Sequence, residues 1–272
     1  MKVITASSAG FCRGVSRAIA RARELAEAYT DGPLIHNEQL MKKLHKEGIS
    51  EIDDIQSVPP GSNLVIRAHG VPPARRKQLE DLGVNLVDAT CPDVARIQGL
   101  IRKYARRGYD ILVLGDKGHP EVVGLLGYAD GNGRLIGSTR DIDSLPDMKQ
   151  VCLVSQSTQF PGHFEKVAES VRRKFPRAVV LNTICPSTRQ RQEDIVELAK
   201  KTDAIVVVGG KQSANTGRLA ELASSLKPAF LIQTADQIDA KTFAQFETVG
   251  LTAGASTPDF IIEEALHRLE SL

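Results

Sequence analysis

The stretch that decides the fold is VNLVDATCPDVARIQGLIRKYARR, residues 84–107. An apolar run with β-strand character ends at Cys91, and an amphipathic helical pattern follows directly. Two other stretches, each with one cysteine, repeat this plan: KVITASSAGFCRGVSRAIARARELAEA, residues 2–28, and AVVLNTICPSTRQRQEDIVELAKK, residues 178–201. Each cysteine therefore lies where a strand gives way to a helix, and the sequence predicts a threefold internal repeat.

Each helical pattern is followed by two more apolar runs that end in polar loops. The first run of each unit, with its loop, spans residues 33–39, 110–122 and 203–216. The second run, with its loop and the helical pattern that follows, spans residues 63–83, 151–175 and 248–269. Short buried strands that alternate with helices indicate parallel sheets, where ligand groups gather at the carboxyl ends of the strands. The sequence therefore predicts three α/β units with mainly parallel sheets, whose loops point to one centre. A single doubly wound sheet, which needs only the general order of strand, loop and helix, is the alternative.

Cys12, Cys91 and Cys185 have the character of metal ligands. They are far apart in sequence, so they match neither the paired ligands of a zinc finger nor a CxxC redox motif. Their position before a helix favours the thiolate, which is the form that binds metal. Three thiolates from three repeats suit a 4Fe-4S cluster with one iron left open for substrate. Cys152 lies inside an apolar run, and we predict that it packs in the core.

Composition indicates no strongly charged partner. The chain has 35 basic and 33 acidic side chains and a net charge of +2, so we expect neither a nucleic-acid nor a membrane partner. No apolar run approaches the roughly 20 residues that span a bilayer, and the first residues lack a secretory pattern. We therefore predict a cytoplasmic protein, in which cysteines serve as ligands more often than as disulfides.

Nine motifs follow one another from residue 10 to residue 260. In order they are GFCRGVSRAI, HNEQL, RAHGV, DATCPDV, GHPEV, SQST, NTICPSTRQRQ, GGKQSANTGRL and TAGASTPDF. Together they strongly resemble the motifs of the LytB/IspH family of 4-hydroxy-3-methylbut-2-enyl diphosphate reductases. Any one motif is weak, but nine in the correct order with three matching cysteines are highly specific.

The resemblance implies a fold and a reaction. The fold is a pseudo-threefold assembly of α/β units around a central 4Fe-4S cluster: residues 13–91, residues 92–185, and residues 186–272 completed by the strand in residues 1–12. The reaction removes the allylic hydroxyl of 4-hydroxy-3-methylbut-2-enyl diphosphate and gives isopentenyl and dimethylallyl diphosphate, the last step of the non-mevalonate pathway. Electrons are expected from a ferredoxin or flavodoxin, and the protein is expected to be a monomer or a homodimer.

The resemblance also assigns residues. Cys12, Cys91 and Cys185 match the three ligands of a cluster with an open apical iron. The implied substrate ligands are His36, His69, His119, Ser157, Ser213, Asn215 and Ser256, and the implied catalytic residues are Glu121, His119 and Ser157. The chemistry fits independently, because imidazole, hydroxyl and amide groups donate hydrogen bonds to a diphosphate, and loss of a hydroxyl requires a proton donor such as Glu121.

Three positions depart from the common family pattern. Ala214 stands where a second hydroxyl is frequent, Ser157 precedes Thr158 where two threonines are usual, and Gln98 replaces a usual histidine. Two other classes of function remain open: a non-redox hydratase or dehydratase that uses the cluster as a Lewis acid, and a non-catalytic cluster-based or zinc-binding sensor. Dependence on a reductant separates the first from the reductase, and metal analysis separates the second.

Overall fold

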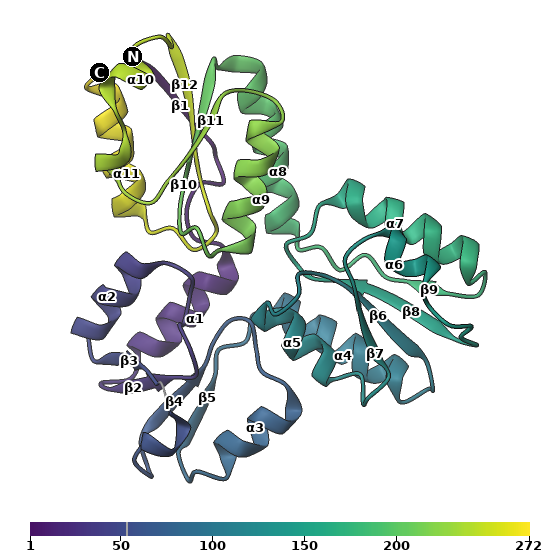
Figure 1. The fold of residues 1–272 in the computed structure, drawn as a ribbon. Helices are drawn as coiled ribbons and strands as arrows, with labels where there is room; N and C mark the ends of the chain where they lie inside the picture. Colours follow the sequence, from purple (N-terminus) through teal and green to yellow (C-terminus); the bar gives the residue numbers. More distant parts are fainter. Residues whose placement is uncertain (53) are drawn as a thin grey trace. The chain divides into compact units, whose positions relative to one another are not determined.

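The chain forms short parallel strands that alternate with helices, as the sequence predicts. The structure is a computed structural model that describes residues 1–52 and 54–272. Three four-stranded sheets form within these ranges, and every pair of neighbouring strands is parallel (Figure 1). The prediction of three α/β units with parallel sheets is confirmed, and a single doubly wound sheet is excluded.

The chain divides into two compact units. Unit 1 contains Met1–Ser16, Ile35–Lys43 and Pro186–Leu272, and unit 2 contains Arg17–Leu34 and Leu44–Cys185. One sheet lies in unit 1 and two lie in unit 2. The predicted division into three domains, with boundaries after residues 91 and 185, stays a prediction. No helix within the described ranges is both long and apolar enough to cross a membrane.

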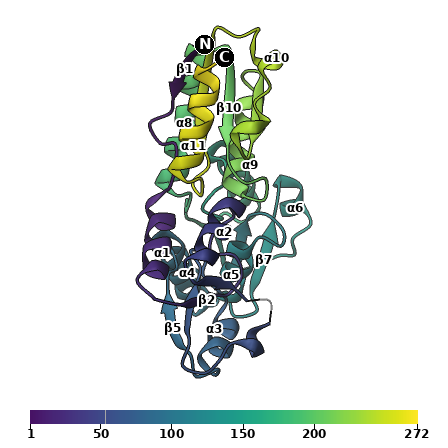
Figure 2. The ribbon, with the colours of Figure 1, turned by 90° about the vertical axis from the view of Figure 1, so that its left-hand side faces the viewer.

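The sheet of unit 1 has the strand order β1-β12-β10-β11. Alternate residues of its central strand face opposite sides: Ile205 and Val207 pack against α8 and α9, whereas Val206 and Val208 pack against α11. Figure 2 shows α11 running along this sheet. The elements are β1 (Lys2–Thr5), α8 (Pro186–Lys201), β10 (Ala204–Val208), α9 (Ala214–Ser224), β11 (Ala229–Ile232), η2 (Ala235–Gln237), α10 (Ala240–Phe243), β12 (Thr248–Ala253) and α11 (Asp259–Glu270).

The first sheet of unit 2 has the order β3-β2-β4-β5. It contains β2 (Ala28–Thr30), β3 (Ile49–Glu51), β4 (Asn63–Ile66) and β5 (Asn85–Asp88), with α3 (Pro73–Glu80) and η1 (Ile55–Ser57) between strands. Helices α1 (Arg13–Arg23) and α2 (Glu38–Lys46) precede β2 and β3 along the chain. Leu64 and Ile66 of β4 pack with Leu79 of α3.

The strand expected in residues 33–39 lies earlier, at β2. Leu34 and Ile35 are buried, but in a loop. The reason is local, because Pro33 has no N–H for a strand ladder and the Oδ1 of Asn37 accepts a hydrogen bond from the N–H of Leu40 in the first turn of α2. Apolar character therefore predicted burial correctly at this position and strand structure wrongly.

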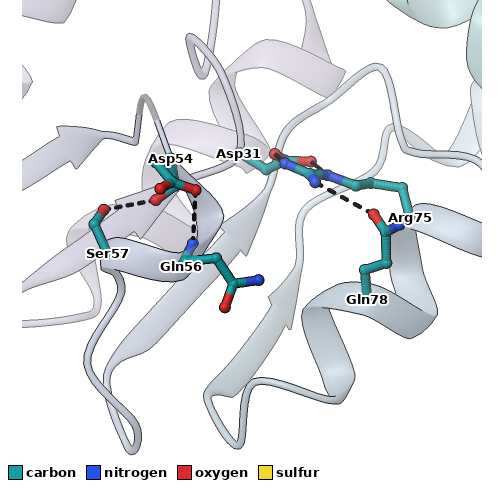
Figure 3. A network of polar contacts seen from close by, with 6 residues as sticks. All are labelled: Asp31, Asp54, Gln56, Ser57, Arg75 and Gln78. Carbon is teal, nitrogen blue, oxygen red and sulfur yellow. Dashed lines mark hydrogen bonds and ion pairs between the residues drawn. The ribbon is translucent and has the colours of Figure 1, made fainter.

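Polar contacts join the carboxyl end of β2 to α3 (Figure 3). Arg75 of α3 donates two hydrogen bonds to the carboxylate of Asp31, from Nη2 to Oδ1 at 2.7 Å and from Nε to Oδ2 at 3.2 Å. The hydrogen bond to Asp31 raises the pKa of Arg75, whereas burial lowers the pKa of the neighbouring Arg67. Gly32 has a φ of 76°, and a Cβ there would lie 2.7 Å from Nη1 of Arg67. This packing fixes the strand end from which the loop of His69 begins.

The second sheet of unit 2 has the order β7-β6-β8-β9. Its elements are α4 (Pro92–Ala105), β6 (Asp110–Leu114), α5 (Pro120–Gly127), β7 (Gly133–Ile136), α6 (Thr139–Asp143), β8 (Val151–Ser155), α7 (Pro161–Lys174) and β9 (Val179–Val180). Ile111 and Val113 pack against α4 and α5, whereas Leu112 and Leu114 pack against α7. Cys152 is 0% exposed in β8, and desolvation raises the pKa of its thiol to about 12. Its predicted place in the core is confirmed.

Candidate functional site

Cys91 and Cys185 lie in neighbouring loops of unit 2. Cys91 is the N-cap residue of α4, with Pro92 at the first helical position, and its N–H donates to the carbonyl of Ala68 at 2.9 Å. The Sγ of Cys185 donates to Oδ2 of Asp93 at 3.2 Å. Because Asp93 belongs to the first turn of α4, the start of this helix brings the two cysteine loops together.

Cys12 lies in unit 1, at the start of α1. Its N–H donates to the carbonyl of Ala255 at 3.1 Å, and its Sγ accepts the N–H of Val15 at 3.4 Å. An N–H donor at the positive end of a helix stabilises negative charge on a sulfur atom. Cys12, like Cys91 and Cys185, is partly exposed and forms no disulfide. All three are therefore accessible thiols near the start of a helix, in contrast to the buried Cys152.

Glu121 is a buried acid of unit 2 that makes two hydrogen bonds to one residue. It is 2% exposed in the first turn of α5, where its Oε1 accepts the N–H of Ser157 at 2.6 Å and its Oε2 accepts the hydroxyl of Ser157 at 2.7 Å. The sheet brings these residues together across 36 positions, because β6 and β8 are adjacent strands and each residue follows one of them. The structure therefore joins two predicted catalytic residues directly.

His119 and His69 lie beside this acid. His119 is the N-cap residue of α5, and its Nδ1 accepts the N–H of Glu121 at 3.1 Å. Its ring meets the ring of His69 edge to face, with 5.4 Å between centroids. A neutral imidazole that accepts at Nδ1 carries its proton on Nε2, so His119 keeps an N–H donor at the far side of its ring.

Backbone bonds connect these side chains to the cysteines of unit 2. The N–H of Cys185 donates to the carbonyl of Ser157 at 2.9 Å. The N–H of Cys91 donates to Ala68, which directly precedes His69. Each of the two cysteines is thus bonded to a loop that carries a proton donor or acceptor.

The predicted diphosphate ligands gather in unit 1, at the carboxyl ends of β10 and β12. Ser213 is the N-cap residue of α9, and its Oγ accepts the N–H of Thr216 at 3.4 Å. Among the described residues, Nδ2 of Asn215 and Oγ of Ser256 are buried and have no hydrogen-bond partner. Buried donors without a partner are costly, and donors beside a helix N-terminus such as that of α9 suit an anion.

Glycines allow the backbones to meet around this site. A Cβ at Gly209 would lie 2.8 Å from Oγ1 of Thr257 and 2.9 Å from Oγ1 of Thr216, so both loops close on this residue. A Cβ at Gly210 would overlap the carbonyl of His36. His36 therefore reaches the end of β10 through its backbone, within the same unit as Ser213.

The three departures have different surroundings. Ala214 begins α9 and adds no polar group. Ser157 keeps the hydroxyl that binds Glu121. Gln98 is 7% exposed on α4, and its Nε2, which has no partner among the described residues, lies against Gly70 in the loop of His69.

Sequence reasoning missed several polar residues that bind the cysteine loops, and Asp93 and Arg17 are two of them. Asp93 accepts from Cys185, and Arg17 donates from Nη1 to the carbonyl of Thr90 at 2.9 Å. Both lie inside quoted motifs, in the helix that follows a cysteine. Their position in the motifs was the only available signal, because their partners lie more than 70 positions away.

The comparisons agree along the whole chain. The model of the LytB protein family matches residues 3–270. The 4-hydroxy-3-methylbut-2-enyl diphosphate reductases of Opitutus terrae and Clostridioides difficile are 49% and 38% identical, and each alignment covers 100% of both chains.

Solved structures of similarly named proteins share the fold. The E-1-hydroxy-2-methyl-but-2-enyl-4-diphosphate reductase from Plasmodium falciparum aligns with a TM-score of 0.93 and 29% identity, over 98% of this chain and 87% of that one. A second structure, described as the (E)-4-hydroxy-3-methyl-but-2-enyl diphosphate reductase that is the terminal enzyme of the non-mevalonate pathway, is 35% identical. Its TM-score is 0.75, over 100% of both chains. From motifs, fold and full-length similarity together, the chain belongs to the LytB family.

Proposed function

We infer that this chain is a 4-hydroxy-3-methylbut-2-enyl diphosphate reductase, an oxidoreductase that completes the non-mevalonate route to isoprenoid precursors. Substrate, two electrons and two protons give isopentenyl or dimethylallyl diphosphate and water. Relatives that are named for this activity align with the chain over the full length of both. The observation that supports it best is buried Glu121, bonded to Ser157, whose carbonyl in turn holds Cys185.

Cys12, Cys91 and Cys185 are the proposed ligands of a 4Fe-4S cluster with one open iron. The donor set fits such a group, because three soft sulfur ligands at helix starts suit iron and no fourth cysteine is available outside the core. When bound, the cluster supplies electrons and a Lewis-acidic iron. A ferredoxin or flavodoxin is the proposed source of those electrons.

The diphosphate is the proposed ligand of Ser213, Asn215 and Ser256. The Nδ2 of Asn215 and the Oγ of Ser256 are buried donors without a partner among the described residues, and a phosphate oxygen would provide one. The N-terminus of α9 adds further N–H groups. His36, His69 and His119 complete the proposed set as hydrogen-bond donors to the substrate.

Glu121 is the proposed source of the proton that leaves with the allylic oxygen. In its ionised form it accepts two hydrogen bonds from Ser157, and these bonds fix its carboxyl plane. The Nε2–H of His119 can donate to a substrate oxygen while its Nδ1 holds the first turn of α5. Ser157 therefore orients the acid. Once Glu121 has taken up a proton, Oε2–H can pass it to Oγ of Ser157 while the hydroxyl proton of Ser157 moves on to the departing oxygen.

The decisive experiment is anaerobic purification with an iron and sulfide assay, followed by turnover with reduced methyl viologen. We expect about four irons and four sulfides per chain, and reductant-dependent loss of the allylic hydroxyl. Turnover without any reductant would instead indicate a non-redox dehydratase. A colourless zinc protein without turnover would reject the reductase.

A further inference from the structure

The peptide group that joins Thr90 to Cys91 is held at both of its polar atoms. Its carbonyl oxygen, on Thr90, accepts a hydrogen bond from Nη1 of Arg17 at 2.9 Å. Its N–H, on Cys91, donates to the carbonyl of Ala68 at 2.9 Å. Two opposed bonds fix the plane of a peptide, and that plane together with the φ of Cys91, −58°, sets the direction of the Cα–Cβ bond of the cysteine.

Arg17 is well placed to hold this peptide. It lies in the second turn of α1 and is partly buried, so its side chain packs before its guanidinium reaches the loop. Thr90 is also restrained on its other side, where its N–H donates to Oδ1 of Asp88 at 2.9 Å. The guanidinium is therefore a fixed positive charge one residue from Cys91.

A second arginine repeats the arrangement in unit 1. Arg191 lies in the second turn of α8, the helix that follows Cys185, and it is 3% exposed. Its Nη2 donates to the carbonyl of Gly10 at 2.6 Å, and its Nη1 donates to the carbonyl of Ser187 at 3.2 Å. Gly10 has a φ of 103° and lies two residues before Cys12. In both cases, an arginine from the helix after one cysteine binds a carbonyl just before a different cysteine.

We propose that Arg17 and Arg191 are positioning residues that orient Cys91 and Cys12 for the cluster and raise its reduction potential. The proposal rests on the proposed function, because it takes these cysteines as ligands. A cluster with three thiolates carries net negative charge, and nearby positive charge favours gain of an electron. Groups that orient a ligand typically change metal affinity or activity by about 10- to 100-fold when they are removed.

Arg17→Gln tests the proposal, with Arg21→Gln as the matched control. Arg21 lies one turn further along α1, and its side chain is exposed. After identical reconstitution, we expect Arg17→Gln to lose cluster affinity or kcat by about 10- to 100-fold, with little change in KM, and its midpoint potential to become more negative. Arg17→Lys keeps the charge, so its midpoint potential should be close to that of wild type. It should regain only part of the cluster affinity.

A readout on the cluster-free protein separates this proposal from the proposed function. Alkylation by iodoacetamide at a pH where the thiols are ionised in every variant, followed by peptide mass spectrometry, measures the exposure of each thiol. Arg17→Gln should speed modification of Cys91 and leave that of Cys12 unchanged, whereas Arg191→Lys should do the reverse. If wild type binds no iron, the proposed function fails, but this cysteine-specific pattern still tests the two arginines.

Two outcomes would overturn the proposal. One is an Arg17→Gln protein with the iron content and midpoint potential of Arg21→Gln. The other is equal alkylation rates of Cys91 in these two variants. Thermal unfolding of each variant shows whether it is folded, and Arg17→Lys provides the test if Arg17→Gln does not fold.

Discussion

The proposed acid site of unit 2 and the proposed anion site of unit 1 differ in how their polar groups are bonded. Both carboxylate oxygens of Glu121 are bonded to Ser157. In contrast, Nδ2 of Asn215 and Oγ of Ser256 have no partner in the described part of the chain. The acid of unit 2 has its hydrogen bonds in place without substrate, whereas these two donors of unit 1 are available to bind a ligand. A group that must deliver a proton needs a fixed geometry, and a group that must bind a phosphate needs free hydrogen-bonding capacity.

The largest effect should follow loss of a proposed ligand cysteine. We expect Cys91→Ser to lose the cluster and all reductase activity, because a serine hydroxyl is a poor ligand for iron–sulfur clusters. Cys152→Ser is the control, since it buries a hydroxyl in β8 at a cost of about 1–3 kcal/mol but touches no proposed ligand. Iron content and thermal unfolding measure the two effects. Full iron content in Cys91→Ser would break the ligand assignment.

The next largest effect should follow loss of the acid. Glu121→Gln keeps the shape of the side chain but removes its ability to donate a proton as an acid, so kcat should fall by about 10²–10⁴-fold. Cluster content and KM should change little, because the anion site lies on other residues. Steady-state turnover with reduced methyl viologen measures both parameters, with Glu165→Gln on the exposed face of α7 as the control. Near-normal turnover would reject Glu121 as the donor.

Ser157→Ala tests how much the hydrogen bond between Ser157 and Glu121 contributes to stability and activity. The change removes the hydroxyl bond to a buried carboxylate, and bonds to charged groups contribute about 1.5–3 kcal/mol. We therefore expect a loss of that size in the free energy of unfolding, together with a lower kcat. Ser157→Thr keeps the hydroxyl and should retain most of both. Equal stability of the alanine variant and wild type would show that the bond contributes nothing.

Ser256→Ala should have the smallest effect on the stability of the folded protein. In contrast to Ser157→Ala, it should weaken substrate binding and leave stability unchanged. Its Oγ has no partner among the described residues, so its removal should not lower the melting temperature. The loss of one hydrogen bond to a phosphate should raise KM by about tenfold. Melting curves with and without inorganic diphosphate provide the measurement. A destabilised variant with unchanged KM would remove the contrast between the two sites.

Much of the fold follows from local pattern in the sequence. Alternation of apolar runs and helical periodicity predicted parallel sheets, and the run around Cys152 predicted a core strand. The strand expected in residues 33–39 was wrong, because Pro33 and the cap at Asn37 outweigh the apolar character of Leu34 and Ile35. The hydrophobic pattern alone therefore does not predict where a strand lies when a proline or a helix cap determines the local backbone structure.

Sequence motifs predict a set of candidate site residues but not the bonds between them. Glu121 and Ser157 were each chosen from their motifs, and yet their pairing depends on the adjacency of β6 and β8. The contacts of Arg17 and Asp93 depend in the same way on how the cysteine loops pack. Such pairings depend on tertiary structure, because the two partners lie far apart in the sequence and no short segment contains both.

The buried thiol of Cys152 has a consequence for damage by air. Its pKa of about 12 keeps it protonated at neutral pH, and a thiol in that form reacts slowly with oxidants. Oxidation of the protein would therefore fall first on the three partly exposed cysteines and spare the hydrophobic interior. If the proposed cluster is present, a sample bleached by oxygen should regain its brown colour after treatment with a reductant, iron and sulfide, with no refolding step.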